Sequence, residues 1–137
     1  MQFFFINKIL FNMEDKLDRL KDIKTENFIW IIYIGIIVLS WYANNKEEKF
    51  ILYDDEISKK QYQNLMILIF SILVIIYYYF TVDSYYDLKK LNIFDSNKKR
   101  NLTYASFTGS LLILISGIIF LIIAILDDDI DTEIAFN

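Results

Sequence analysis

Three stretches of this chain contain no charged residue, and each is long enough to cross a lipid bilayer. They cover residues 27–45, 61–82 and 101–126, which are 19, 22 and 26 residues long. A transmembrane helix needs about 20 consecutive, mainly apolar residues. The pattern therefore predicts an all-α fold, an integral membrane three-helix bundle, with the transmembrane domain over residues 27–126. The spans themselves are expected at about residues 28–43, 62–82 and 106–126.

An N-terminal amphipathic helix is predicted ahead of the first span, within residues 1–26. Apolar side chains recur there at helical spacing, at Leu10, Met13, Leu17 and Leu20. We expect this helix to pack on the membrane surface or on a sister helix. Residues 1–12 either lie in the membrane interface or extend upstream of a true start at Met13. A cleaved signal peptide is not predicted, because Lys8 interrupts the apolar run and no small-residue cleavage site follows it.

The connection between the first two spans, residues 44–60, is rich in charged residues and is predicted to be a solvated acidic loop. Asp54, Asp55 and Glu56 stand together in it and offer a second interpretation, a site for a divalent cation. Hard cations require six or more oxygen ligands in a defined loop, and the calcium-loop spacing and its glycine are missing from this segment. The solvated loop is therefore the preferred interpretation.

The second and third spans are predicted to form an extended hairpin. Helical periodicity continues beyond the second span to Leu91 and stops at Asp95, Ser96 and Asn97. Asp95 or Ser96 then caps the next helix, which enters the membrane near Phe107. Both helices are expected to project beyond the bilayer by about 10–16 Å.

Aromatic residues near the ends of the spans are expected to anchor the helices in the two membrane interfaces. These interface anchors are Trp30, Trp41, Tyr42, Tyr77, Tyr78 and Tyr79. Lys and Arg number five before the first span, four in the first connection, five in the hairpin tip and none after the third span. The positive-inside rule then places the N-terminus and the hairpin tip in the cytoplasm and the C-terminus outside. The sequon at Asn101 would face the cytoplasm and carry no glycan.

The residue types that the chain lacks exclude most catalytic chemistry. It contains no Cys, His or Pro, so thiol nucleophiles, Cys/His zinc sites and the commonest general base are missing. The predicted spans contain no ionisable residue other than Tyr, whereas pumps and proton relays keep charged residues at membrane depth. We expect no enzyme activity, no cofactor, no metal and no small-molecule substrate. The net charge of −4 argues against nucleic acid as a partner.

Small residues along the third span predict a helix-packing seam. The seam consists of Gly109, Ser110, Ser116, Gly117 and Ala124. In lipid, helices associate by close backbone approach and by interhelical hydrogen bonds, both of which small residues permit. The seam's partner is either the first and second spans, with Gly35 as a candidate position, or a neighbouring copy. A narrow pore is the alternative, lined by the hydroxyls of Ser40, Ser71, Thr108, Ser110 and Ser116.

The C-terminal segment, residues 127–137, is an acidic tail with apolar residues toward its end. Five acids and no basic residue stand in it, together with Ile130, Ile134 and Phe136. An acidic run is usually a solvated tail. The apolar residues instead indicate a docking tail, with Ile130 and Ile134 on one face of a helix, and the sequence leaves both interpretations open.

The chain resembles small three-span proteins of unassigned function encoded by amoeba-infecting giant DNA viruses. The resemblance rests on the Asn-, Ile-, Lys- and Tyr-rich composition and on the segments NFIWIIYIGIIVLSWYA, DSNKKRNLTY and EIAFN. It implies a component of a virion membrane or of a virus-modified compartment, and it carries over no catalytic residue. The expected function is that of a non-enzymatic structural or adaptor membrane protein. Its expected partners are the lipid bilayer and either a second copy or a membrane or capsid-type protein, and the alternative is a small oligomeric pore or ion-channel subunit.

Overall fold

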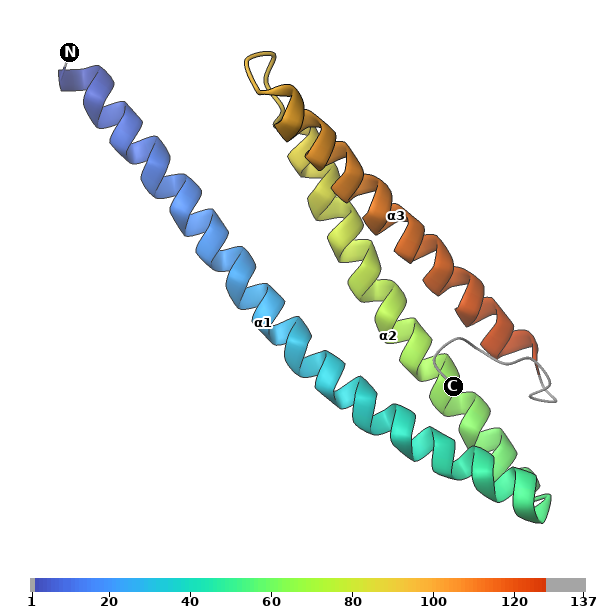
Figure 1. Ribbon diagram of the computed structural model, residues 1–137. Coiled ribbons are helices and arrows are strands. Elements are labelled where there is room, and N and C mark those ends of the chain that lie inside the picture. The colour runs from blue at the N-terminus through green and yellow to red at the C-terminus, as the bar shows by residue number, and fades with distance from the viewer. Residues whose placement is uncertain (1, 128–137) are drawn as a thin grey trace. The chain divides into compact units, whose positions relative to one another are not determined.

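The computed structural model describes the backbone of residues 2–127 and the side chains of residues 13–127. That part of the chain contains three helices and no strand: α1 (Gln2–Tyr53), α2 (Glu56–Lys89) and α3 (Asn97–Leu126) (Figure 1). All three helices are long and apolar enough to cross a membrane. The predicted all-α fold with three helices of membrane-spanning length is confirmed.

The first helix is continuous from the amphipathic segment into the first span. α1 runs from Gln2 to Tyr53, and no residue at the expected boundary near Asn27 leaves the helix. The apolar stripe that the sequence indicates is exposed, with Met13, Leu17 and Leu20 at 53%, 62% and 56% of their full accessible surface. The amphipathic segment is therefore a direct extension of the span rather than a separate helix. The predicted docking tail, with Ile130, Ile134 and Phe136, lies outside the described residues.

The connection between α1 and α2 is much shorter than predicted. The expectation of a loop over residues 44–60 is wrong, because only Asp54 and Asp55 lie outside the two helices. Lys and Glu are good helix formers, so the charged residues after the span extend α1 instead of ending it. Asp54 adopts the left-handed conformation with φ 50°, which reverses the chain and which Asp tolerates better than most residues.

Asp55 is the N-cap of α2, which explains one carboxylate of the suspected cation site. Its Oδ1 accepts a hydrogen bond from the Ile57 backbone N–H at 3.1 Å, and its Oδ2 accepts one from the Ser58 hydroxyl at 2.8 Å. A capping carboxylate satisfies backbone donors that the first helical turn leaves unpaired. Among residues 13–127, no group of three or more Asp, Glu, His or Cys side chains is placed to hold a metal ion.

The connection between α2 and α3 is a short capped loop, as the sequence indicates. α2 ends at Lys89, slightly before the predicted Leu91, and α3 begins at Asn97. The N-cap of α3 is Ser96, whose hydroxyl accepts from the Lys99 backbone N–H at 3.2 Å. Asp95 tightens the loop by accepting from the Asn92 backbone N–H at 2.7 Å and from the Lys99 ammonium at 3.2 Å.

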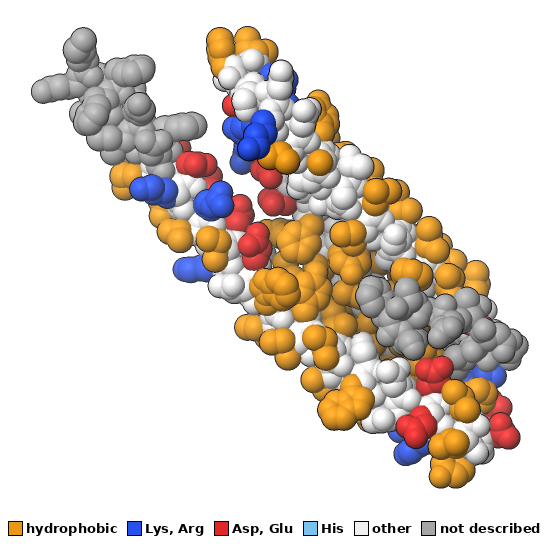
Figure 2. All heavy atoms as spheres, in the orientation of Figure 1, with side chains coloured by type: hydrophobic (Ala, Val, Ile, Leu, Met, Phe, Trp, Pro, Cys, Tyr) orange, Lys and Arg blue, Asp and Glu red, His pale blue; other side chains and the backbone are white. Residues whose placement is uncertain are grey.

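The helices α2 and α3 lie side by side and antiparallel as a hairpin (Figure 1). Aromatic pairs join them at two levels: the ring centroids of Phe70 and Phe120 are 5.7 Å apart, and those of Tyr85 and Phe107 are 6.0 Å apart. On the visible face of the hairpin, hydrophobic side chains gather along the middle and charged ones lie toward the ends (Figure 2). This division is the one expected of helices whose middle parts face lipid.

Candidate functional site

The first candidate site is the face of α3 that meets α2, here called the inner face and defined by Ser110, Gly117 and Ala124. These residues are seven apart and share one side of the helix. Gly117 and Ala124 are both buried. A Cβ atom at Gly117 would lie 3.0 Å from Cδ2 of Tyr77 and 3.4 Å from Cγ2 of Val74. Gly117 is therefore a point of close approach between the two helices, and a side chain there would have to shift the Tyr77 ring.

Hydrogen bonds reinforce the inner face on the side of the α2–α3 connection. The Thr81 hydroxyl lies 3.1 Å from the Ser110 carbonyl and 2.8 Å from the Tyr77 carbonyl, and these two acceptors share its single proton. The Ser110 and Ser84 hydroxyl oxygens are 3.1 Å apart and hydrogen-bonded to one another. In a membrane, an interhelical hydrogen bond of this kind contributes about 0.6 kcal/mol on average. The two helices are thus joined by polar contacts as well as by close packing.

At the opposite end of the inner face, Gln63 of α2 contacts α3, a contact that the sequence did not predict. The Gln63 amide nitrogen donates to the carbonyls of Ala124 and Ile125, each at 3.3 Å. These carbonyls belong to the last turn of α3, where no intrahelical N–H is left to pair with them. The signal in the sequence is an amide side chain at the start of the second span, level with the end of the third.

The other two residues of the predicted seam, Gly109 and Ser116, lie on a different side of α3. Here the outer face denotes Ala105, Gly109 and Ser116, which lie on one side of α3, about a third of a turn from the inner face. A Cβ atom at Gly109 would have no neighbour within 4 Å, and the same holds at Gly35. Ser116 is exposed. The predicted seam is therefore divided, with Ser110, Gly117 and Ala124 against α2 and Gly109 and Ser116 away from it.

Two of the hydroxyls suggested for a pore, those of Ser71 and Ser110, form hydrogen bonds within α2 and α3. Ser71 donates to the Ile67 carbonyl of its own helix at 2.6 Å, and Ser110 is bonded to Ser84. Thr108 and Ser116 are exposed on α3. Ser110 and Ser116 lie on different sides of α3, because six residues rotate the helix by about 240°, so these hydroxyls do not form one line along the hairpin.

The predicted interface anchors fall into two groups. Trp30, Trp41, Tyr42 and Tyr78 are exposed, with 64%, 72%, 49% and 63% of their surface accessible. Such positions are open to lipid headgroups, as expected of anchors. Tyr77 and Tyr79 are half-buried, and the Tyr77 ring lies against Gly117. Tyr77 is thus a packing residue of the hairpin as well as a member of the aromatic cluster.

The second candidate site is the hairpin tip, which begins beyond Val82 and continues into the first turns of α3. Ile93 and Phe94 stand at its apex, 81% and 87% exposed. Five basic residues flank them: Lys89, Lys90, Lys98, Lys99 and Arg100. The loop that presents them is ordered by Ser96, by Asp95 and by a hydrogen bond from the Arg100 guanidinium to the Asn92 carbonyl.

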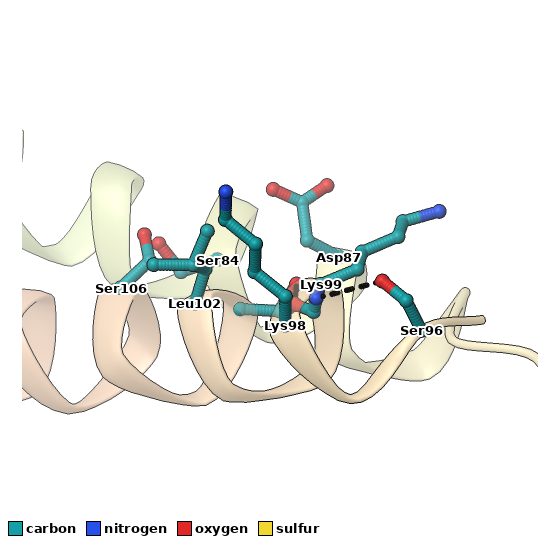
Figure 3. Close-up of a pocket in the computed structure, with 8 residues that line it drawn as sticks. Ser84, Asp87, Ser96, Lys98, Lys99, Leu102 and Ser106 are labelled. Carbon is teal, nitrogen blue, oxygen red and sulfur yellow. Dashed lines mark hydrogen bonds between the residues drawn. The ribbon is translucent and has the colours of Figure 1, made fainter.

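A hollow of about 390 Å³ lies on one side of the tip, between α2 and α3. It is lined by Ser84, Asp87, Ser96, Lys98, Lys99, Leu102, Thr103 and Ser106. Figure 3 shows Asp87, Lys98 and Lys99 extending to the same side of the hairpin. The hollow therefore combines ammonium, carboxylate and hydroxyl groups from two helices.

The carboxylates that cap the two connections have lowered pKa values. Asp95 accepts hydrogen bonds from the Asn92 backbone and from the Lys99 side chain, and these lower its pKa from the ordinary 3.8. The Ser58 hydroxyl is the main cause of the lowered pKa of Asp55. Both carboxylates remain ionised through the neutral range and act as permanent acceptors at the helix ends.

The chain matches no protein-family model, no curated protein and no solved structure.

Proposed function

We propose that this chain is a non-enzymatic structural or adaptor protein of a membrane that docks a larger partner through the hairpin tip. The single observation that carries the proposal is the exposure of Ile93 and Phe94 at the apex of an ordered, capped loop. Burying a large apolar side chain contributes about 1.5–3 kcal/mol. Two large apolar residues exposed to water and surrounded by cationic side chains are typical of a surface that a partner covers.

The height of the tip supports a partner outside the bilayer to which the chain belongs. From Val82, the last residue of the charge-free stretch, α2 rises about 10 Å to its end at Lys89. The headgroup region adds only about 5–8 Å to each side of the hydrocarbon core. The apex therefore reaches past the headgroups, where a protein can meet it.

Self-association is the second candidate, and the outer face of α3 favours it. Gly109 has open space where a Cβ would be, and Ser116 is exposed beside large apolar residues such as Ile115 and Ile119. Small residues of this kind allow a second helix to approach closely in lipid. The inner face is already occupied by α2, so a second copy would use the outer face.

We also propose how the chain is oriented in its membrane and which membrane that is. The N-terminus and the tip face the cytoplasm, and the acidic C-terminus lies outside, because the N-terminal segment and the tip contain ten of the 14 basic residues. The resemblance to giant-virus membrane proteins supports a virion membrane or a virus-modified compartment, with a capsid-type protein as the docked partner. Absence of Cys and His from the sequence, and of ionisable groups other than Tyr from the three predicted spans, supports a role without catalysis.

A photo-crosslinking amino acid in place of Phe94 tests the proposal in membranes. We expect one discrete adduct with another protein, and no such adduct when the probe replaces the similarly exposed Tyr53 at the end of α1 (76% exposed). The same probe at Ile119 reports on the outer face, where a dimer of the chain would support self-association. Adducts with lipid alone at Phe94 would overturn the docking proposal. Ion flux from the purified protein in liposomes would instead support the pore.

A further inference from the structure

A second hollow, of about 400 Å³, lies along the last turns of α1, at the end of the hairpin opposite to the tip. Every described residue that lines it belongs to α1. Four of these residues are spaced four, three and four positions apart, so they share one side of the helix. They are Tyr42, Lys46, Lys49 and Tyr53, and they define the aromatic–lysine face. Two lysines thus stand between two aromatic residues.

The charges of the aromatic–lysine face have no acidic partner in the part of the chain that the structure describes. Tyr42, Lys49 and Tyr53 are exposed. The Lys46 ammonium lies 5.2 Å from the centroid of the Tyr42 ring, and neither lysine forms an ion pair with a described residue. Glu48 borders the hollow, but about a quarter of a turn away from Lys49. Both lysines are therefore available to acidic side chains from elsewhere.

The end of α3 lies at the level of this face. The Gln63 amide donates to two carbonyls in the last turn of α3, each at 3.3 Å. Gln63 stands seven residues after the start of α2 at Glu56, and Lys46 stands seven residues before the end of α1 at Tyr53. Because a turn of only two residues reverses the chain between α1 and α2, residues equally far from the turn are level. Lys46, Gln63 and the last turn of α3 are therefore at about the same level.

The ten residues after Asp127 are long enough to reach the aromatic–lysine face. Ten extended residues span about 33 Å. Neighbouring helix axes are about 8–10 Å apart, so even two such steps, from α3 across α2 to α1, take only about 20 Å. Three membrane crossings also put the end of α1 and the C-terminal segment on the same side of the bilayer. The hairpin tip is at the other end of the 30-residue α3, about 45 Å away.

The tail, here residues 128–137, complements the aromatic–lysine face in charge and in order. It contains no basic residue, its acids come first, at positions 128, 129, 131 and 133, and Ile134 and Phe136 come last. On α1, Lys46 is level with the end of α3, Lys49 lies about one turn farther out, and Tyr53 about one turn beyond that. Moving away from the end of α3, both segments therefore change from charged to apolar or aromatic.

We propose that the tail docks on the aromatic–lysine face of its own chain. Asp131 pairs with Lys46, Glu133 pairs with Lys49, and the apolar end of the tail packs on Tyr53. The docked tail ties the end of α3 to the end of α1. The proposal rests on the three membrane crossings and not on the docking role of the hairpin tip.

Disulfide formation between the tail and the hollow tests the proposal in membranes, since the chain has no cysteine of its own. The variant L52C/A135C leaves the residues of the proposed contacts in place. We expect an intramolecular disulfide that forms about tenfold faster than in I57C/A135C, because docking raises the local concentration of the tail at the hollow. Ile57 is the matched control, exposed at the start of α2 but outside the hollow. Equal rates would show that the tail does not dock.

The ion pairs are tested in the L52C/A135C background. K49E should slow disulfide formation about threefold, because an attractive pair becomes a repulsive one, and E133K added to it should restore the rate. K60E is the matched control, since Lys60 lies on the same side of the membrane and outside the hollow, and it should leave the rate unchanged. Equal slowing by K49E and K60E would overturn the proposal in favour of diffuse electrostatic attraction.

A mixture of chains that carry L52C alone and A135C alone identifies the occupant. We expect no disulfide-linked dimer, because each tail docks on its own chain. A dimer formed as fast as the intramolecular disulfide would overturn the proposal in favour of the tail of a second copy. Unchanged helical circular dichroism in each variant excludes misfolding as the cause.

Discussion

The inner and outer faces of α3 have similar small residues and opposite surroundings. Gly117 on the inner face would place a Cβ atom 3.0 Å from the Tyr77 ring, whereas Gly109 on the outer face would place it in open space. Ser110 exchanges hydrogen bonds with α2, and Ser116 is exposed. The difference shows that a small residue in a membrane helix permits close approach without specifying what approaches.

What distinguishes the two faces is the partner that α2 supplies. The bulky groups opposite the inner face, Tyr77 and Val74, fill the space above Gly117, and the hydroxyls of Thr81 and Ser84 pair with Ser110. Burial of apolar surface gives little gain against lipid, so these close contacts and hydrogen bonds are what hold α2 and α3 together. The hairpin is therefore one packed unit, and the outer face is available to lipid or to another protein.

The largest expected effect comes from placing Leu on each face in turn. Gly117→Leu should lower the free energy of unfolding by about 1–3 kcal/mol, because the inserted side chain overpacks the contact with Tyr77. Gly109→Leu, the matched control, should leave stability within about 0.5 kcal/mol of the native value. Unfolding in mixed micelles with increasing SDS, followed by circular dichroism, measures both. Equal destabilisation by the two variants would refute the distinction between the faces.

A smaller effect is expected from the hydroxyls. Ser110→Ala and Ser84→Ala should each lower stability by about 0.6 kcal/mol, and the double variant should lose less than the sum, because both remove the same hydrogen bond. Ser116→Ala on the outer face is the control and should change nothing measurable. The same SDS titration supplies the double-mutant cycle. Full additivity of Ser84→Ala and Ser110→Ala would mean that their hydroxyls are not coupled.

The smallest expected effect is a pH-dependent one, at the loop between α2 and α3, beyond the inner and outer faces. The pKa of Asp95 is lowered by hydrogen bonds from the Asn92 backbone and from Lys99, so its ¹³C-detected titration midpoint should lie below 3.8. Because the folded pKa is the lower one, the stabilisation by this carboxylate is present above the unfolded pKa and disappears as the pH falls through the folded midpoint.

A variant at Lys99 sharpens this titration. Lys99→Gln should raise the midpoint of Asp95 toward 3.8 without reaching it, since the backbone hydrogen bond remains. The inner-face hydrogen bonds should be unaffected over the same pH range, because they contain no titrating carboxylate. A midpoint at or above 3.8 in the native chain would contradict the loop geometry.

The helices were predictable from the sequence because their signals are local. Charge-free stretches of about the right length define three spans, and Ser96 before a run of basic residues marks the start of α3. The acidic connection was not predictable by the same rule. Charged residues after a span are typical of a loop, but Lys and Glu also extend a helix into water. The turn between α1 and α2 depends instead on Asp54, whose left-handed backbone reverses the chain.

The candidate sites were only partly predictable, because they depend on which residues of two helices face each other. Spacing placed Ser110, Gly117 and Ala124 on one side of α3, but it could not choose between α2 and a second copy as their neighbour. The amide of Gln63 stands at the start of the second span, but its partners became apparent only once the end of α3 was found beside it. The hollow at the tip likewise depends on residues of both α2 and α3, which only the register of the hairpin brings together.

Disulfide formation across the inner face tests the central claim most directly, since the chain has no cysteine of its own. The Ser84 and Ser110 hydroxyl oxygens are 3.1 Å apart, so two cysteines at these positions need only a small adjustment to form a bond of about 2.0 Å. The account predicts that oxidised S84C/S110C in membranes forms an intramolecular disulfide and migrates as a monomer, and that S110C alone gives no dimer. A disulfide-linked dimer from S110C alone would show that the inner face meets a second copy and would contradict the account.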